Sequence, residues 1–134
     1  MSQENVDVVN GLFENTNARD FGAVLEAYAD DIVLVLHGET QIGGKGEIGK
    51  EAVGRWFGEW FSTFDRDYRF EIEEVRDWGD RVFVVATHHG RGRASGVPFA
   101  DQAAWIYTVL GGKIVRCDAY DSRAQALEAA GQRE

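Results

Sequence analysis

The sequence predicts an α+β fold in which helices pack on one face of a curved antiparallel sheet. Apolar residues recur at helical spacing in the first half of the chain, whereas strand-like alternation fills most of the second half. Glycine-containing pairs separate the later apolar segments, as is typical of hairpin turns. The length of 134 residues fits one domain, so we expect residues 1–134 to form a single domain.

Two helices are predicted before the first strand. Residues 4–17 carry apolar side chains at helical spacing, and Asp20 can cap a second helix that carries Tyr28 on its apolar face. The β-branched, apolar residues 32–37 then predict a mostly buried strand. The glycine-dense segment 38–49 predicts a loop with one short strand.

An aromatic stripe predicts the third helix. Its members are spaced by three and four residues, as one helical face requires, and are Val53, Trp56, Phe57, Trp60, Phe61 and Phe64. Gly54 and Gly58 interrupt the stripe at a cost of about 1 kcal/mol each relative to alanine. Their small size permits the close approach of another backbone or of a ligand.

Four strands and a short final helix are predicted in the second half. The strands are residues 68–78, 81–92, 103–110 and 113–120, joined in pairs by turns at 79–80 and 111–112. The apolar phase changes at Glu73 and Glu74, which predicts a β-bulge that bends the sheet. Ser122 and Gln125 fit a capping box for a helix that ends before Gly131.

The charge of the chain argues against several partners. Lys and Arg number 14 and Asp and Glu number 23, so the net charge is −9, which repels nucleic-acid phosphates and anionic lipids. The single cysteine, Cys117, cannot form an intrachain disulfide, and the polar start of the chain shows no signal-peptide pattern. We therefore expect a cytoplasmic protein that binds neither nucleic acid nor membranes.

Several segments together carry a family resemblance. They include Val8–Val9, Asn17–Phe21, Tyr28–Val33, Gly44–Gly46, Gly49–Val53, Gly79–Val82, Gly112–Arg116 and Tyr120–Gly131. These segments resemble SnoaL-like proteins of the nuclear transport factor 2-like superfamily, which includes ketosteroid isomerases, scytalone dehydratase and polyketide cyclases. The resemblance implies a cone-shaped fold in which helices cover the concave face of the sheet around an internal pocket, and it implies a homodimer.

The resemblance assigns the superfamily's known sites to positions of this chain. The tyrosine, general base and acid of the steroid isomerases fall on Leu12, Leu36 and about Ala104, all of which are apolar. Apolar groups neither take a proton nor stabilise an enolate, so this matching argues against that site. The acid of the cyclases falls near Ala119, with two aspartates close by.

Four residues are candidates for catalysis. His37 ends the first strand beside the isomerase base position, and histidine changes charge near neutral pH, where acid–base catalysis is most efficient. Because His88 and His89 are adjacent on one strand, one of them faces the pocket, and we expect His89 or Tyr107 to act together with His37. Tyr107 and Asp101 complete this set. The alternative for His37 is a solvated histidine at the end of a strand, and the alternative for Asp101 is a solvated carboxylate in a loop.

Five residues are candidates for binding an apolar ligand, because each offers a ring or a small soft surface to a pocket: Tyr28, Trp56, Trp60, Trp105 and Cys117. The alternative for each is ordinary packing in the core. Arg91 and Arg93 form a small basic patch that fits either an anion clamp or pairing with surface acids.

Two hypotheses about function stay open. The first is a binding module for a hydrophobic small molecule. The second is an enzyme that uses acid–base chemistry without a cofactor, as an isomerase, cyclase, dehydratase or hydrolase acting on a hydrophobic carbonyl compound. No metal site is expected, since adjacent histidines diverge on a strand and one cysteine cannot form a zinc cluster.

Overall fold

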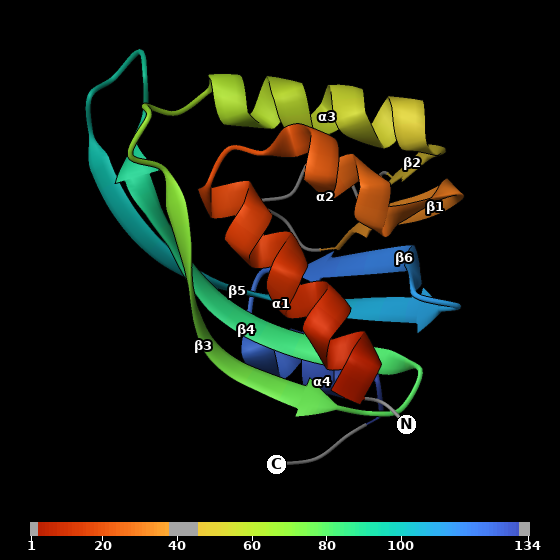
Figure 1. Cartoon of the computed structure of the whole chain (residues 1–134). Helices are drawn as coiled ribbons and strands as arrows, with labels where there is room; N and C mark the ends of the chain where they lie inside the picture. Colours follow the sequence, from red (N-terminus) through yellow and green to blue (C-terminus); the bar gives the residue numbers. More distant parts are fainter. Residues whose placement is uncertain (1–2, 38–45, 132–134) are drawn as a thin grey trace.

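The computed structural model describes residues 3–37 and 46–131 and shows the predicted α+β fold (Figure 1). In chain order the elements are α1 (Gln3–Asn17), α2 (Phe21–Ala27), β1 (Tyr28–Leu36), β2 (Gly46–Ile48), α3 (Lys50–Ser62), β3 (Arg69–Asp77), β4 (Arg81–Arg91), β5 (Pro98–Leu110), β6 (Lys113–Tyr120) and α4 (Arg123–Ala129). Residues 38–45 of the predicted loop lie outside the described residues.

The six strands form one sheet in the order β2-β1-β6-β5-β4-β3. All neighbouring pairs are antiparallel except β1 and β6, which are parallel, so the sheet is mixed rather than wholly antiparallel. In Figure 1, β3, β4 and β5 curve around α1, α2 and α3, which lie on the concave side, while α4 lies on the opposite face. The helices therefore reach both faces, although α4 covers only part of its own.

Local sequence signals account for the bend and the turns. The register between β3 and β4 shifts between Ile72 and Glu74, which confirms the predicted bulge. Gly111 and Gly112 connect β5 to β6 with φ angles of 58° and 79°, which L-residues with a side chain rarely adopt. At α4, the Ser122 hydroxyl accepts a hydrogen bond from the Gln125 amide at 3.2 Å, as its sequence predicts.

The second helix ends earlier than its sequence predicts. Asp20 caps it as expected, accepting from the Ala23 amide at 3.2 Å, but the helix stops at Ala27. Tyr28 is instead the first residue of β1, with extended backbone and its ring stacked on Phe57 at 6.2 Å. A helix of seven residues is too short to be stable alone, so burial of the Tyr28 ring decides its conformation.

Strand β4 is buried on both of its faces. Val82, Val84 and Ala86 join the core under α1 and α3. Phe83 and Val85 face the other way and pack in a second cluster that contains residues of α4. Two-sided burial explains why this strand reads as an uninterrupted apolar run. No helix within the described ranges has the length and hydropathy needed to cross a bilayer.

Candidate functional site

A cavity of about 520 Å³ lies between the concave face of the sheet and helices α1 and α3. Its volume lies within the range of small-molecule sites. Half of the residues that line it, counted over the described part of the chain, carry a phenylalanine, tyrosine or tryptophan ring. The cavity wall is therefore built mainly from aromatic surface.

Helix α3 supplies one wall of the cavity. Trp56 and Trp60 are one helical turn apart, and their rings stack with centroids 5.5 Å apart and planes 8° from parallel. Opposite them, alternate residues of β5 face the cavity, among them Trp105 and Tyr107. Each of these residues was predicted as a site residue, and each lines the cavity.

A chain of polar groups crosses the aromatic wall. The Trp60 indole Nε1–H donates to the Tyr68 hydroxyl at 3.0 Å, and that hydroxyl lies 2.9 Å from His88 Nδ1. An indole N–H only donates, so the Tyr68 hydroxyl accepts from Trp60. When the hydroxyl gives its own proton to Nδ1, neutral His88 carries its proton on Nε2.

Gly90 makes the position of Tyr68 possible. A Cβ atom built at Gly90 would lie 2.9 Å from the Tyr68 Cα and 3.2 Å from its Cβ, closer than real Cβ atoms come. The missing side chain lets β4 accept the Tyr68 ring, which is almost wholly buried. Gly90 therefore positions the hydroxyl that contacts His88.

Burial sets the charge of this polar chain. Burial lowers the pKa of His88, and the nearby Asp101 carboxylate, which raises it, does not outweigh that effect. Burial also disfavours the charged form of Tyr68 and so raises its pKa, although Trp60 and Arg19 act in the opposite direction. At neutral pH both side chains are therefore uncharged.

Asp101 lies inside β5 rather than in a loop before the strand. The strand begins at Pro98, and Asp101 pairs in register with His88 on the face that lines the cavity. The side chain is exposed, which places it where the cavity meets solvent. The structure thus brings Asp101 and His88 together.

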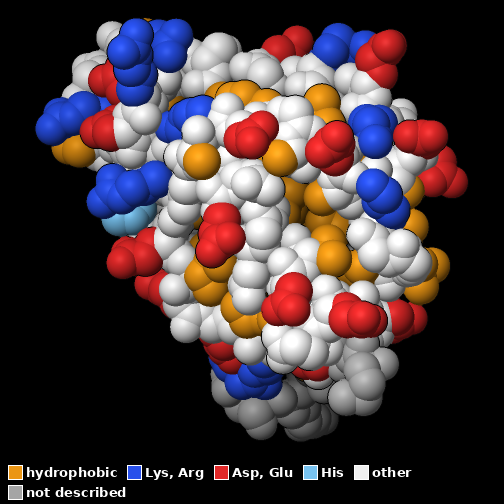
Figure 2. All heavy atoms as spheres, in the orientation of Figure 1, with side chains coloured by type: hydrophobic (Ala, Val, Ile, Leu, Met, Phe, Trp, Pro, Cys, Tyr) orange, Lys and Arg blue, Asp and Glu red, His pale blue; other side chains and the backbone are white. Residues whose placement is uncertain are grey.

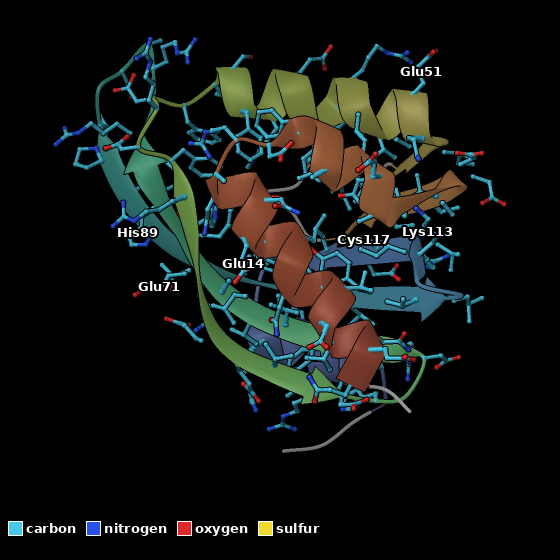
Figure 3. All side chains as sticks on the ribbon, in the orientation of Figure 1. Glu14, Glu51, Glu71, His89, Lys113 and Cys117 are labelled. Atoms are coloured by element: carbon cyan, nitrogen blue, oxygen red, sulfur yellow. The ribbon has the colours of Figure 1, made fainter. Side chains whose placement is uncertain are left out.

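Tyr28, Tyr107 and Cys117 form a buried polar group in the cavity wall. Tyr107 and Cys117 are register partners on β5 and β6, and Tyr28 lies close enough to influence the pKa of Tyr107. Burial raises the pKa of all three side chains, so they are protonated and neutral. Figure 3 shows Cys117 on the helix side of β6. A protonated, buried thiol is a poor nucleophile.

His37 does not line the cavity. Its Nε2 lies 2.9 Å from Asp118 Oδ1, and its ring stacks on Tyr120 at 4.4 Å. Arg116 donates two hydrogen bonds to the same carboxylate at 2.8 and 3.0 Å. Tyr120 belongs to the cluster on the outer face, so the side chain of His37 turns away from Leu36, which does line the cavity.

His89 also faces outward. Because side chains alternate along β4, His88 shares the face of Val84 and Ala86 while His89 points away. Figure 3 shows His89 beside Glu71 on the side of the sheet away from the helices. The two side chains approach to 3.6 Å. The structure therefore brings His88, not His37 or His89, together with Asp101 and Tyr107 at the cavity.

Of the two family positions matched to β5 and β6, one faces away from the cavity and the other faces into it. Ala104 packs in the outer cluster, and the cavity-facing neighbour on β5 is Ala103. On the last strand, Ala119 and the half-buried Asp121 line the cavity, whereas Asp118 lies on the outer face with His37. A shift of one residue exchanges the faces of a strand, so the sequence match alone leaves the face undetermined.

The sequence did not single out several cavity residues. Tyr68 and Phe99 contact the His88 ring, and Phe64 of the predicted aromatic stripe stacks on Tyr68 at 4.3 Å. The available signal was alternation, since Phe70 and His88 are register partners and both face inward. Among the residues that the structure describes, no three metal-ligating side chains gather at one place.

Comparison with known proteins identifies related chains. A family model described as a SnoaL-like domain matches residues 9–117. No protein of curated function matches the sequence.

Solved structures share the fold at low sequence identity. A protein of ketosteroid isomerase-like fold from Catenulispora acidiphila, in complex with trimethylamine, is 21% identical with a TM-score of 0.74, covering 94% of this chain and 93% of that one. RV0760c from Mycobacterium tuberculosis, in complex with estradiol-17β-hemisuccinate, is 21% identical with a TM-score of 0.75, covering 90% and 95%. An NTF2-like protein of unknown function from Burkholderia pseudomallei is 21% identical with a TM-score of 0.77, covering 96% and 97%.

Proposed function

Because the chain belongs to the SnoaL-like domain family, we propose that it binds a ring-containing, apolar small molecule in the cavity between the sheet and α3. The aromatic lining of the 520 Å³ cavity is the observation that carries the proposal. Aromatic walls favour flat ring systems through stacked and edge-on contacts. The Tyr68–His88 pair supplies a polar anchor that orients the ligand.

The structural neighbours support a small-molecule role without defining the ligand. One of them was solved with an amine and another with a steroid hemisuccinate, which carries a carboxylate. Their ligands therefore differ both in size and in charge. At the low identity of these neighbours, ligand chemistry for this chain has to be argued from its own side chains.

Steroid-isomerase chemistry by the family's usual groups is not part of the proposal. Leu12 and Leu36, at the tyrosine and base positions, line the cavity with apolar side chains. Ala103, the inward neighbour of the third position, is apolar as well. These three residues support a site that lacks the isomerase's proton-transfer groups.

Calorimetric titration with naphthyl methyl ketone tests the binding proposal. We expect saturable binding to the wild-type protein and loss of binding in Ala103→Phe, which fills the cavity from β5. Ala100→Phe is the matched control, since Ala100 is exposed on the same strand and outside the lining. Binding that survives Ala103→Phe, or no binding at all, contradicts the proposal. Native mass spectrometry of the purified protein would reveal a ligand that co-purifies.

A second candidate function is cofactor-free acid–base catalysis on a hydrophobic carbonyl compound. The observation that favours it is the placement of His88 and Asp101 across from each other at the cavity. When Nδ1 accepts from Tyr68, neutral His88 carries its proton on Nε2 and can donate it to a carbonyl oxygen. The Asp101 carboxylate can accept the proton from the adjacent carbon, giving an enol that is reprotonated on the same face.

Deuterium exchange at the methyl group of naphthyl methyl ketone, followed by NMR, tests this second candidate. We expect the wild-type protein to accelerate exchange, Asp101→Asn to abolish the acceleration and His88→Gln to reduce it by about 10²-fold or more. His89→Gln, on the outer face, is the control and should exchange like wild type. Equal rates for all four proteins leave only the binding function.

We also propose that the chain forms a homodimer through the outer face of its sheet. Within the described residues, helix α4 packs mainly on β5 and β6 rather than on β1 and β2. Val33 and Val35 of β1 remain half-buried there, and Ile48, the register partner of Val33, is 75% exposed. An uncovered apolar edge of this kind favours association with a second copy.

A further inference from the structure

The charges on the cavity wall all have one sign. Within residues 3–37 and 46–131, the lining includes the carboxyl side chains of Asp101 and Asp121 but no lysine or arginine. His88 adds no positive charge at neutral pH, because burial lowers its pKa. A ligand in the cavity therefore meets negative charges and aromatic rings.

The aromatic rings act in the same direction as the carboxylates. The face of an aromatic ring carries partial negative charge and attracts a cation placed within about 6 Å of its centre, most strongly for tryptophan. Three tryptophans line the cavity, namely Trp56, Trp60 and Trp105. Within a cavity shielded from water, this attraction is stronger than at an exposed surface.

The arginine beside Tyr68 is held by other partners. Arg19 donates to the main-chain oxygens of Thr16, Arg66 and Tyr68, and its guanidinium lies over the Phe61 ring. None of the described arginines belongs to the lining.

The basic patch predicted from the sequence also lies elsewhere. Arg91 contacts the Gly96 carbonyl in the connection between β4 and β5, and both Arg91 and Arg93 are exposed. In Figure 2 the basic side chains gather at the upper left, over this connection, while acidic side chains are spread across the helical face. The patch is therefore outside the cavity lining and not placed to clamp a bound carboxylate.

We propose that the cavity selects ring-containing ligands that carry a positively charged nitrogen, a quaternary or protonated amine, over carboxylates and neutral molecules of the same shape. The ammonium group lies against the tryptophan faces, and Asp101 attracts it at the solvent side of the cavity. This inference rests on the proposed binding function and adds the charge of the ligand to it.

Three probes of similar shape test the selection: benzyltrimethylammonium, its neutral carbon isostere neopentylbenzene, and phenylacetate. Quenching of tryptophan fluorescence reports binding, because Trp56, Trp60 and Trp105 line the cavity. We expect the ammonium probe to bind about tenfold more tightly than the neutral isostere. Phenylacetate should bind most weakly.

Two variants separate the contribution of the Asp101 carboxylate from that of the tryptophan rings. Asp101→Asn should weaken ammonium binding by about threefold and leave neopentylbenzene unchanged. The control Asp31→Asn removes an exposed acid outside the lining and should change neither affinity. Trp56→Leu keeps an apolar wall but removes a ring, so it should weaken the ammonium probe and spare the neutral one.

The outcomes distinguish the proposed selection for a positive charge from the proposed binding function on which it rests. If neopentylbenzene or phenylacetate binds as tightly as the ammonium probe, the charge selection is wrong while the binding function stands. If naphthyl methyl ketone and all three probes fail to bind, the proposed binding function is wrong, and so is the proposed selection for a positive charge.

Discussion

At the scale of single residues, the Tyr68 hydroxyl carries two hydrogen bonds inside the cavity wall. Tyr68→Phe removes the acceptor of the Trp60 N–H and the hydrogen-bond partner of His88 Nδ1. Leaving buried polar groups unpaired costs about 1–3 kcal/mol, so we expect a loss of that size in the free energy of unfolding, measured with urea.

The same substitution has a spectroscopic signature. We expect Tyr68 to donate to Nδ1 in the wild-type protein, which places the proton of neutral His88 on Nε2. In Tyr68→Phe the proton is free to occupy either nitrogen. Nitrogen-15 NMR of the His88 ring should therefore show one tautomer in wild type and a mixture in the variant. A single unchanged tautomer in both proteins means that Tyr68 does not orient His88.

The sequence identified the aromatic residues of the site better than its histidines. Trp56 and Trp60 lie on an unambiguous helical stripe, so their common direction follows from spacing alone. The histidines lie on or next to strands, where side chains alternate between the two faces of the sheet. Which face a histidine occupies therefore depends on the exact register of the strand. Strand β4 is apolar on both faces, so its pattern does not say which of His88 and His89 faces inward.

At the scale of elements, the close packing of β4 against Tyr68 depends on Gly90. In Gly90→Ala the added Cβ meets backbone and ring atoms at 2.9 to 3.3 Å, so Tyr68 must move. Overpacking of this kind costs about 1–3 kcal/mol, and we expect that loss of stability in urea denaturation together with weaker ligand binding.

Gly58→Ala is the matched control for that substitution. No atom lies within 4 Å of a Cβ at Gly58, which is exposed in the middle of α3. Alanine there should stabilise the protein by about 1 kcal/mol, because it is the better helix former. Equal effects of the two substitutions would mean that the contact at Gly90 is not what constrains Tyr68.

Elements with local signals were predicted closely, and elements set by tertiary contacts were not. The caps at Asp20 and Ser122 and the bulge before Glu74 follow from nearby residues, and the structure confirms them. Tyr28 leaves its predicted helix because its ring is buried against α3, which no local pattern encodes. The parallel pairing of β1 with β6 joins distant segments and was likewise beyond the sequence pattern.

At the scale of the whole molecule, acid should destabilise the protein in two steps. An unfolded histidine titrates near pH ~6.5, and burial lowers the pKa of His88 in the folded protein. The unfolded chain thus takes up this proton first as the pH falls, so stability decreases below pH ~6.5 until folded His88 is also protonated. His88→Gln should remove this step from urea midpoints measured against pH. An unchanged pH slope in the variant contradicts the assignment.

The second step involves the carboxylates. Burial alone raises the pKa of Asp118, but hydrogen bonds from Arg116 and His37 outweigh it and lower the pKa below the usual range. The stability contributed by this carboxylate is present above pH ~3.9 and is lost as the pH falls through the folded pKa. Asp118→Asn should flatten the acid limb and leave the step near pH ~6.5 in place.

The proposed homodimer concerns the molecule as a whole, because it decides what covers the outer face of the sheet. Light scattering at micromolar concentration should give twice the chain mass of 14.9 kDa. Ile48→Lys places a charge in the apolar edge formed with Val33 and Val35, where burial of an unpaired charge is costly, so we expect it to give monomers. Val97→Lys changes another exposed apolar residue, in the connection between β4 and β5, and should stay dimeric. A monomeric wild type removes the dimer, whereas dissociation by both substitutions places the interface elsewhere.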